Sequence, residues 1–233
     1  MKKSAFAAFA LLAALPAFAG RPLTTEDATT LGDKACQIES WVDRTRGNVT
    51  DFSFVPACTY FDTEFQFGAV RTREAGSSST SGTFFQAKHA FRSIDDGPWG
   101  VGLVVGASRT LNREEKNNWG DPYVIVPVSL GFGDDKDSRL LVHLNIGTTR
   151  ARDEGRNLTL WGVAFEKPLT EKFTILGEAF GENAKKPFVR LGGRYTLFER
   201  FDVDLTYVTR SGGTKEDRYF SIGFHAETEP FLP

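Results

Sequence analysis

Apolar residues occupy every second position in twelve short stretches of the chain. In the clearest stretch, Phe61, Phe65 and Phe67 fall on one face, whereas Asp62 and Glu64 fall on the other. A period of two is typical of a β-strand with two unlike faces. The expected strands comprise residues 34–46, 49–58, 61–74, 83–93, 99–109, 121–132, 138–149, 157–167, 172–181, 187–196, 201–210 and 216–227.

Longer polar loops and compact turns alternate along this series of strands. Residues 75–82 and 111–120 form long connections, whereas residues 134–137 and 168–171 form compact turns. This alternation places both termini at the compact-turn end, as in outer-membrane barrels with an even number of strands. We therefore predict an all-β fold, a closed antiparallel up-and-down transmembrane β-barrel of about 12 strands. A water-soluble β-sandwich is the alternative, but it requires apolar faces that meet each other in a core.

The two faces of each expected strand differ in polarity. Over residues 201–207 the odd-numbered positions are apolar, while Asp202, Asp204 and Thr206 occupy the even-numbered ones. A shift of one residue would place both carboxylates in lipid, so the register is well specified. The apolar face should therefore contact lipid and the polar face the lumen. An aromatic girdle is expected near the compact turns, formed by Tyr60, Trp99, Phe132, Phe173, Tyr195 and Phe201.

The N-terminus carries the pattern of a secretory leader. Lys2 and Lys3 precede an apolar stretch at 5–15, and Ala17-Phe18-Ala19 forms an A-x-A cleavage pattern. An uncleaved anchor helix is the alternative, but the stretch is too short to span a bilayer. We expect residues 1–19 to be a signal peptide cleaved after Ala19, residues 20–33 an N-terminal periplasmic extension or plug, residues 34–227 the barrel, and residues 228–233 a C-terminal tail. The expected location is the bacterial outer membrane.

Composition and charge narrow the function class. The chain has 28 basic and 30 acidic residues, a formal charge of -2, and loss of Lys2 and Lys3 makes it about -4. A nucleic-acid binder needs a basic stripe, so this class is disfavoured. With 21 Phe, 23 Gly and a single Met, the composition suits strands and tight turns better than a helical core. Metal-ligand spacing is missing from the sequence, and we expect no metal and no cofactor.

Two cysteines give a separate test of the first hairpin. If this hairpin turns about Gly47, paired residues have numbers that sum to about 94, so Cys36 lies opposite Cys58. Cβ atoms of such pairs are about 4.5–5.5 Å apart, which a disulfide can reach after a small adjustment. An exported chain favours a Cys36–Cys58 disulfide, and two free thiols are the alternative.

Charged residues gather on the expected lumen face. The densest group could form a constriction that selects solutes, or an ion-pair ladder that satisfies buried charges; it comprises Glu178, Arg190, Arg194, Asp202 and Asp204. In the expected register Glu178 neighbours Arg190, and Arg194 lies opposite Asp202 or Asp204. A second lumen cluster could comprise Asp62, Glu64, Lys88 and Arg92.

The three histidines offer little basis for catalysis. Small outer-membrane lipid hydrolases use a lipid-facing histidine with a serine two residues later, and His89, His143 and His225 are followed there by Phe91, Asn145 and Glu227. The sequence lacks a G-x-S-x-G motif. Ser221 and His225 share a lumen face but lie about 13 Å apart along the strand. We expect no catalytic residues and no enzyme activity, with a lipid-modifying enzyme as the least favoured function.

The segment Arg21-Pro22-Leu23-Thr24-Thr25-Glu26-Asp27-Ala28, followed by Gly32 and by Gln37-Ile38-Glu39-Ser40-Trp41, carries a family resemblance. It resembles a proteobacterial family with a leader, an R-P-L-x-T-x-D-A element, a glycine, and a first strand containing an acid and an aromatic residue. The resemblance implies an outer-membrane, transporter-like barrel associated with aromatic-degradation pathways. It implies no particular substrate.

Together these features predict a passive channel or uptake protein for small solutes in the outer membrane. The expected partners are outer-membrane lipid and a small solute, without nucleic acid. A plugged barrel with a structural or surface-interaction role, using loops 75–82 and 110–120, is the competing function.

Overall fold

The computed structural model describes residues 22–46, 48–74, 76, 79–111, 120–135, 138–152, 154–183 and 185–233. The predicted signal peptide and residues 112–119 of the long loop lie outside these ranges.

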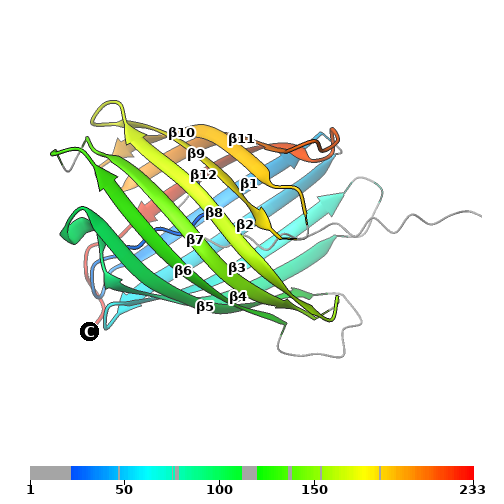
Figure 1. Cartoon of the computed structure of the whole chain (residues 1–233), viewed down its shortest axis with the longest axis horizontal. Coiled ribbons are helices and arrows are strands. Elements are labelled where there is room, and N and C mark those ends of the chain that lie inside the picture. The colour runs from blue at the N-terminus through cyan, green and yellow to red at the C-terminus, as the bar shows by residue number, and fades with distance from the viewer. Residues whose placement is uncertain are drawn as a thin grey trace, which may run out of the picture.

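Twelve antiparallel strands close into one barrel, because β1 pairs with β12 and each other strand pairs with its neighbours in sequence (Figure 1). The strands are β1 Cys36–Thr45, β2 Val49–Tyr60, β3 Thr63–Glu74, β4 Thr80–Arg92, β5 Trp99–Leu111, β6 Asp121–Phe132, β7 Leu140–Ala151, β8 Arg156–Pro168, β9 Phe173–Glu182, β10 Phe188–Phe198, β11 Phe201–Arg210 and β12 Arg218–Glu227. The predicted fold class is confirmed.

The barrel wall has an apolar outer face and a polar inner face. On β3, Phe67 is 52% exposed while the adjacent Gln66 is 2% exposed. The same alternation makes Leu205 and Ile222 exposed and Thr206 and Ser221 buried. Large apolar side chains cover the outside because that face is suited to lipid, while the polar side chains satisfy one another within the lumen.

Two local features of the backbone differ from the sequence prediction. The second turn falls at Phe61 and Asp62, whose φ values of 52° and 55° suit a two-residue hairpin loop, so β2 continues to Tyr60. Asp62 is therefore an exposed turn residue and is wrongly placed in the lumen cluster. A register shift between Ala90 and Arg92 also reverses the alternation at the end of β4.

The bulge moves Arg92 to the outer face. Arg92 pairs with Val101, its guanidinium lies 4.2 Å from the centre of the Trp99 ring, and its Nε donates to the Trp99 carbonyl at 3.1 Å. Arg92 is therefore not part of the lumen cluster. A single 3₁₀ turn, η1 Ile94–Asp96, follows the bulge and leads into β5.

The start of β1 and the C-terminal tail meet at the compact-turn end of the barrel (Figure 1). The backbone N–H groups of Phe231 and Leu232 donate to the Lys34 carbonyl, at 3.0 and 3.2 Å. Cys36 lies opposite Cys58, and the two form the predicted disulfide. Among the described residues, the structure contains no helix with the length and apolarity needed to cross a bilayer.

Candidate functional site in the barrel lumen

Residues 22–31 lie inside the barrel, and we call this part of the chain the lumen segment. Leu23, Thr25, Glu26 and Ala28 are each at most 5% exposed, although no regular element contains them. Leu23 packs against Ala164 and Leu176 in a small apolar cluster of buried side chains. In narrower barrels the side chains of the wall fill the lumen, but twelve strands enclose a larger volume. The lumen segment occupies this additional volume.

Two glycines leave room for the lumen segment against the wall. A Cβ atom at Gly162 on β8 would lie 2.5 Å from the Thr25 hydroxyl. A Cβ atom at Gly100 on β5 would lie 3.0 Å from the Ala28 carbonyl oxygen and 2.5 Å from the Ile94 nitrogen. Any larger residue would require the segment or the wall to move, so these positions adapt the wall to the segment.

Glu178 on β9 holds the first part of the segment. Its carboxylate accepts the backbone N–H groups of Thr24 and Thr25, at 2.9 and 2.8 Å, and the Thr25 hydroxyl at 2.8 Å. Arg190 on β10 lies 2.9 Å from the same carboxylate and also donates to the Pro22 carbonyl. The ion pair therefore satisfies its own buried charges and the backbone of the segment together.

Lys88 on β4 holds the next part of the segment. Its ammonium lies 2.9 Å from the Asp27 carboxylate and 3.4 Å from that of Glu26. Gln86 donates to Glu26 at 3.0 Å. Asn145 on β7 accepts the Glu26 N–H and donates to the Glu26 carbonyl, both at 2.7 Å, and so pairs with the segment as a neighbouring strand would.

Glu26 belongs to the lumen segment and not to a membrane-spanning strand. Complete burial raises the pKa of this carboxyl to about 8, while Lys88 and Gln86 act in the opposite direction. The neighbouring acids Asp27 and Glu64 raise the pKa further. Burial outweighs the opposing effect of Lys88, so Glu26 retains its proton to a higher pH than a free glutamate.

Ser129, His143 and Glu166 form a polar row under Ala28. The Ser129 hydroxyl oxygen lies 2.8 Å from His143 Nδ1, and His143 Nε2 lies 3.7 Å from a Glu166 oxygen. The Ala28 N–H donates to the same serine oxygen at 2.8 Å, and Ser129 is fully buried. A substrate has no access to this hydroxyl while the segment is in place, so the row acts here as an attachment for the segment.

The predicted charged group gathers around two arginines in the structure. Glu178 and Arg190 pair as the register predicts. Arg194 lies opposite Asp204, as the register predicts, and it also forms an ion pair with Glu166, across the intervening strand β9. Asp202 lies 3.6 Å from His225.

The second predicted cluster retains only its buried members. Glu64 and Lys88 face the lumen, whereas Asp62 and Arg92 do not. Glu64 accepts the Leu31 N–H at 3.2 Å and the Gln37 amide at 3.3 Å. In the described part of the chain, no group of three His, Cys, Asp or Glu residues is arranged so that it could hold a metal ion.

Several residues of the lumen are not predicted from the sequence. Glu26 and Asp27 could have been found, because they are an acid pair in a segment expected near the lumen of a barrel with inward-facing cations. Gln86, Ser129, Asn145 and Glu166 gave no signal, because uncharged or single polar residues occur at most inward positions of any such barrel.

Comparisons with known proteins agree with this architecture. A family model described as "Uncharacterised conserved protein UCP029691" matches residues 7–226. The chain belongs to this family. No curated protein sequence matches this family member.

Solved structures with the same architecture include outer-membrane porins. The KdgM porin matches with a TM-score of 0.62 at 9% identity, over 83% of this chain and 99% of that one. The KdgM porin in complex with disordered oligogalacturonate gives a TM-score of 0.56 at 6% identity, over 84% and 99%. The NanC porin gives 0.57 at 10% identity, over 82% and 98%. At these identities the likeness establishes the fold: this family member has the fold of a porin-type barrel.

Proposed function

We propose that this protein is an outer-membrane channel for small solutes whose lumen is closed by its own N-terminal segment. The observation that carries the proposal is the polar attachment of residues 22–31 inside a twelve-stranded wall. Twelve strands enclose more space than side chains fill in an eight-stranded barrel. Departure of the segment would therefore leave an aqueous passage lined by polar residues.

The nature of the contacts favours a segment that can leave. Beyond the packing of Leu23 and the close fit against Gly100 and Gly162, the contacts that hold it are hydrogen bonds and ion pairs, for example with Glu178 and Lys88. Water can replace such contacts at a modest net cost per bond. Cleavage after Ala19 would place a new N-terminus two residues before Pro22, which would give the segment a free end.

Porins of the same fold support a solute role. The KdgM porin has been solved with an oligogalacturonate, so a barrel of this fold accommodates an anionic oligosaccharide. The family resemblance associates such barrels with aromatic-degradation pathways, which makes aromatic acids the first solutes to test. The role of Glu178, Arg190, Arg194, Asp202 and Asp204 in solute selection belongs to this proposal.

The proposal is tested with the mature chain in planar lipid bilayers. We expect low conductance with brief openings from the full mature chain, and sustained conductance from a variant that lacks residues 22–31. A matched control lacks residues 212–214 in the β11–β12 loop and should behave like the full chain.

The opposite outcome would support a permanently plugged barrel with a structural or surface-interaction role. This outcome is a deletion variant that folds, judged by circular dichroism and heat-modifiable migration, and yet passes no ions and no solute into liposomes. Release of fatty acid from pure phospholipid or lipid A by the protein would instead revive the lipid-modifying enzyme.

A further inference from the structure

The outer wall carries a row of arginines at the end of the barrel with the longer loops. Arg44 on β1 and Arg71 and Arg73 on β3 fall on outward positions of their strands. Thr50 on β2 pairs with both Arg44 and Arg73, so these side chains lie in one cross-strand row. Arg44 donates to the Thr50 hydroxyl at 3.3 Å, and the Arg73 guanidinium lies 5.4 Å from the Phe52 ring centre.

Two further arginines extend this row beyond β1. Arg218 begins β12 on the same outward alternation as Phe220 and Ile222. Arg46 follows β1, and its backbone N–H donates to the Arg218 carbonyl at 3.4 Å. We call Arg44, Arg46, Arg71, Arg73 and Arg218 the arginine row.

The positive charge of the arginine row is not balanced by neighbouring acids. Of the acids adjacent to these arginines in sequence, Asp43 lies on the lumen side opposite Asp51, Asp217 forms an ion pair with Arg210, and Glu74 follows Arg73 on the opposite alternation of β3. Within the part of the chain that the structure describes, none of the five guanidinium groups forms an ion pair. By contrast, Arg150 is the one outward arginine that the described strands β6 to β11 place at this end, and it donates to Asn157 at 3.2 Å.

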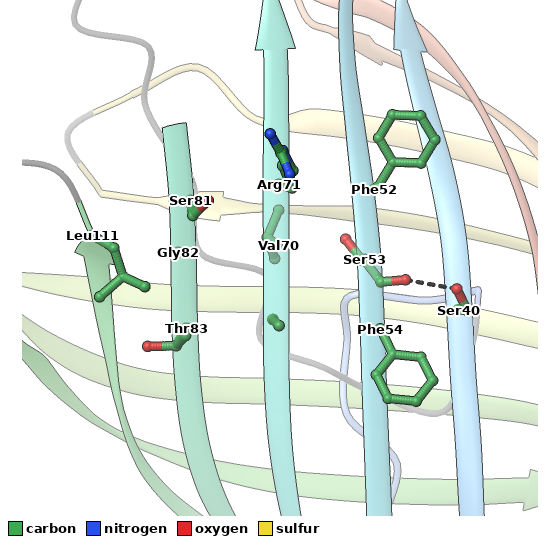
Figure 2. Close-up of a pocket in the computed structure, with 11 residues that line it drawn as sticks. Ser40, Phe52, Ser53, Phe54, Val70, Arg71, Ser81, Gly82, Thr83 and Leu111 are labelled. Carbon is green, nitrogen blue, oxygen red and sulfur yellow. Dashed lines mark hydrogen bonds between the residues drawn. The ribbon is translucent and has the colours of Figure 1, made fainter. Parts of the chain in front are cut away.

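A groove of about 360 Å³ opens on the outer wall directly beside the arginine row (Figure 2). The small side chains of Ala69 and Thr83 lie between the larger Phe54 and Leu111, and Ser40 lies on the other side of Phe54. The Ser40 hydroxyl donates to the Ser53 carbonyl at 2.8 Å, so its polarity is already satisfied (Figure 2).

Arg71 belongs both to the arginine row and to the lining of the groove. An occupant of the groove would therefore meet mainly apolar surface, together with small hydroxyl side chains, and a guanidinium group at one end. This is the arrangement of an acyl chain joined to an anionic headgroup.

We propose that this surface binds a phosphorylated glycolipid of the outer leaflet, with its phosphate on the arginine row and an acyl chain in the groove. Guanidinium groups bind phosphate through paired hydrogen bonds, and several together discriminate a highly charged headgroup from a zwitterionic one. In outer-membrane barrels the end with the longer loops faces the outside, which places the row at the outer leaflet. Charge complementarity and the adjoining groove together select this occupant.

The test measures binding of diphosphoryl lipid A to the purified full chain in detergent by native mass spectrometry. The triple variant Arg44→Ala/Arg71→Ala/Arg73→Ala should lower the affinity at least tenfold. Arg150→Ala, an outward arginine at the same end of the opposite wall, should change it less than twofold. Ala69→Trp fills the groove and should weaken binding several-fold without removing a charge.

Three results would overturn the proposal. The first is a correctly folded triple variant that binds lipid A as tightly as the wild type. The second is equal binding of lipid A stripped of its phosphates, or of phosphatidylglycerol. The third is an Ala69→Trp variant with unchanged affinity, which would exclude an acyl chain in the groove. None of these results affects the proposed channel, because every substituted side chain lies outside the lumen.

Discussion

The two charged attachments of the lumen segment bind different parts of it. Glu178 accepts the backbone N–H groups of Thr24 and Thr25, which any residues there would provide. Lys88 instead contacts the side-chain carboxylates of Glu26 and Asp27. The first attachment therefore depends on the wall, while the second also depends on the sequence of the segment. This difference shows which substitutions should release each part.

Loss of Glu178 should have the largest effect. Glu178→Gln leaves Arg190 as a buried charge without its carboxylate, and breaking such a pair costs about 3–5 kcal/mol. We expect much faster maleimide labelling of an Ala28→Cys reporter, which the native disulfide does not complicate. Glu182→Gln is the control, because its partner Lys185 lies near the surface. Equal labelling of both variants would contradict the role of Glu178.

Loss of Lys88 should have a smaller effect. Lys88→Met leaves Glu26 and Asp27 without their cation, and unsatisfied buried polar groups cost about 1–3 kcal/mol. The double variant Lys88→Met/Glu26→Gln should recover part of the loss, with a coupling of about 0.5–3 kcal/mol. The reporter labelling rate provides the measurement. Strict additivity of the two substitutions would show that the attachment is not a direct contact.

A substitution on β8 tests the two attachments of the lumen segment without changing any charge. Gly162→Val places side-chain atoms where Thr25 now lies, and overpacking of this kind costs about 1–3 kcal/mol. The segment should loosen around Thr25 while its contact with Lys88 persists, which hydrogen exchange of the two regions can resolve. Gly32→Ala is the matched control, because a Cβ there meets nothing within 4 Å. Uniform loosening along the segment would contradict two separate attachments.

The dependence on pH should be the smallest effect and should concern Glu26. Its pKa is about 8 in the lumen and near 4.5 when free, so the bound segment holds a proton that the released segment loses. Attachment should therefore be strongest below pH 4.5 and weaken as the pH rises toward 8. Nearby Lys88 limits the loss, because it compensates the charge that Glu26 gains. Labelling rates of the Ala28→Cys reporter between pH 5 and 8 are divided by the rate of a free cysteine at the same pH, because the thiolate is the reacting form. The corrected rates should rise for the reporter chain and stay flat when it also carries Glu26→Gln.

The outer wall could be predicted well from the sequence because each strand reports its own faces. Phe65 and Phe67 alternate with Glu64 and Gln66, and the Cys36–Cys58 pair independently fixes the first register. Local deviations were not visible in this pattern. The bulge after Ala90 moves Arg92 to the outer face. The sequence there still alternates between apolar and polar residues, so the bulge cannot be recognised from the pattern.

The lumen could be predicted only in part because its contacts are not local. Glu178 and Arg190 lie on neighbouring strands, so register alone brought them together. Arg194 and Glu166 lie two strands apart, and Thr25 reaches Glu178 over 153 residues of sequence. No periodicity reports such contacts, since the lumen segment has no regular structure.

The most direct test of the account is a reversible covalent lock between the segment and the wall. A Cβ at Gly162 would lie 3.2 Å from the Thr25 Cβ, close to the separation of about 3.5–4.5 Å in disulfides. The measurement is the conductance of the Thr25→Cys/Gly162→Cys variant in planar bilayers before and after reduction, with the reduced wild type as control. We expect that the oxidised variant does not conduct and that reduction restores openings. Equal conductance before and after reduction, with the lock verified by mass spectrometry, would contradict it.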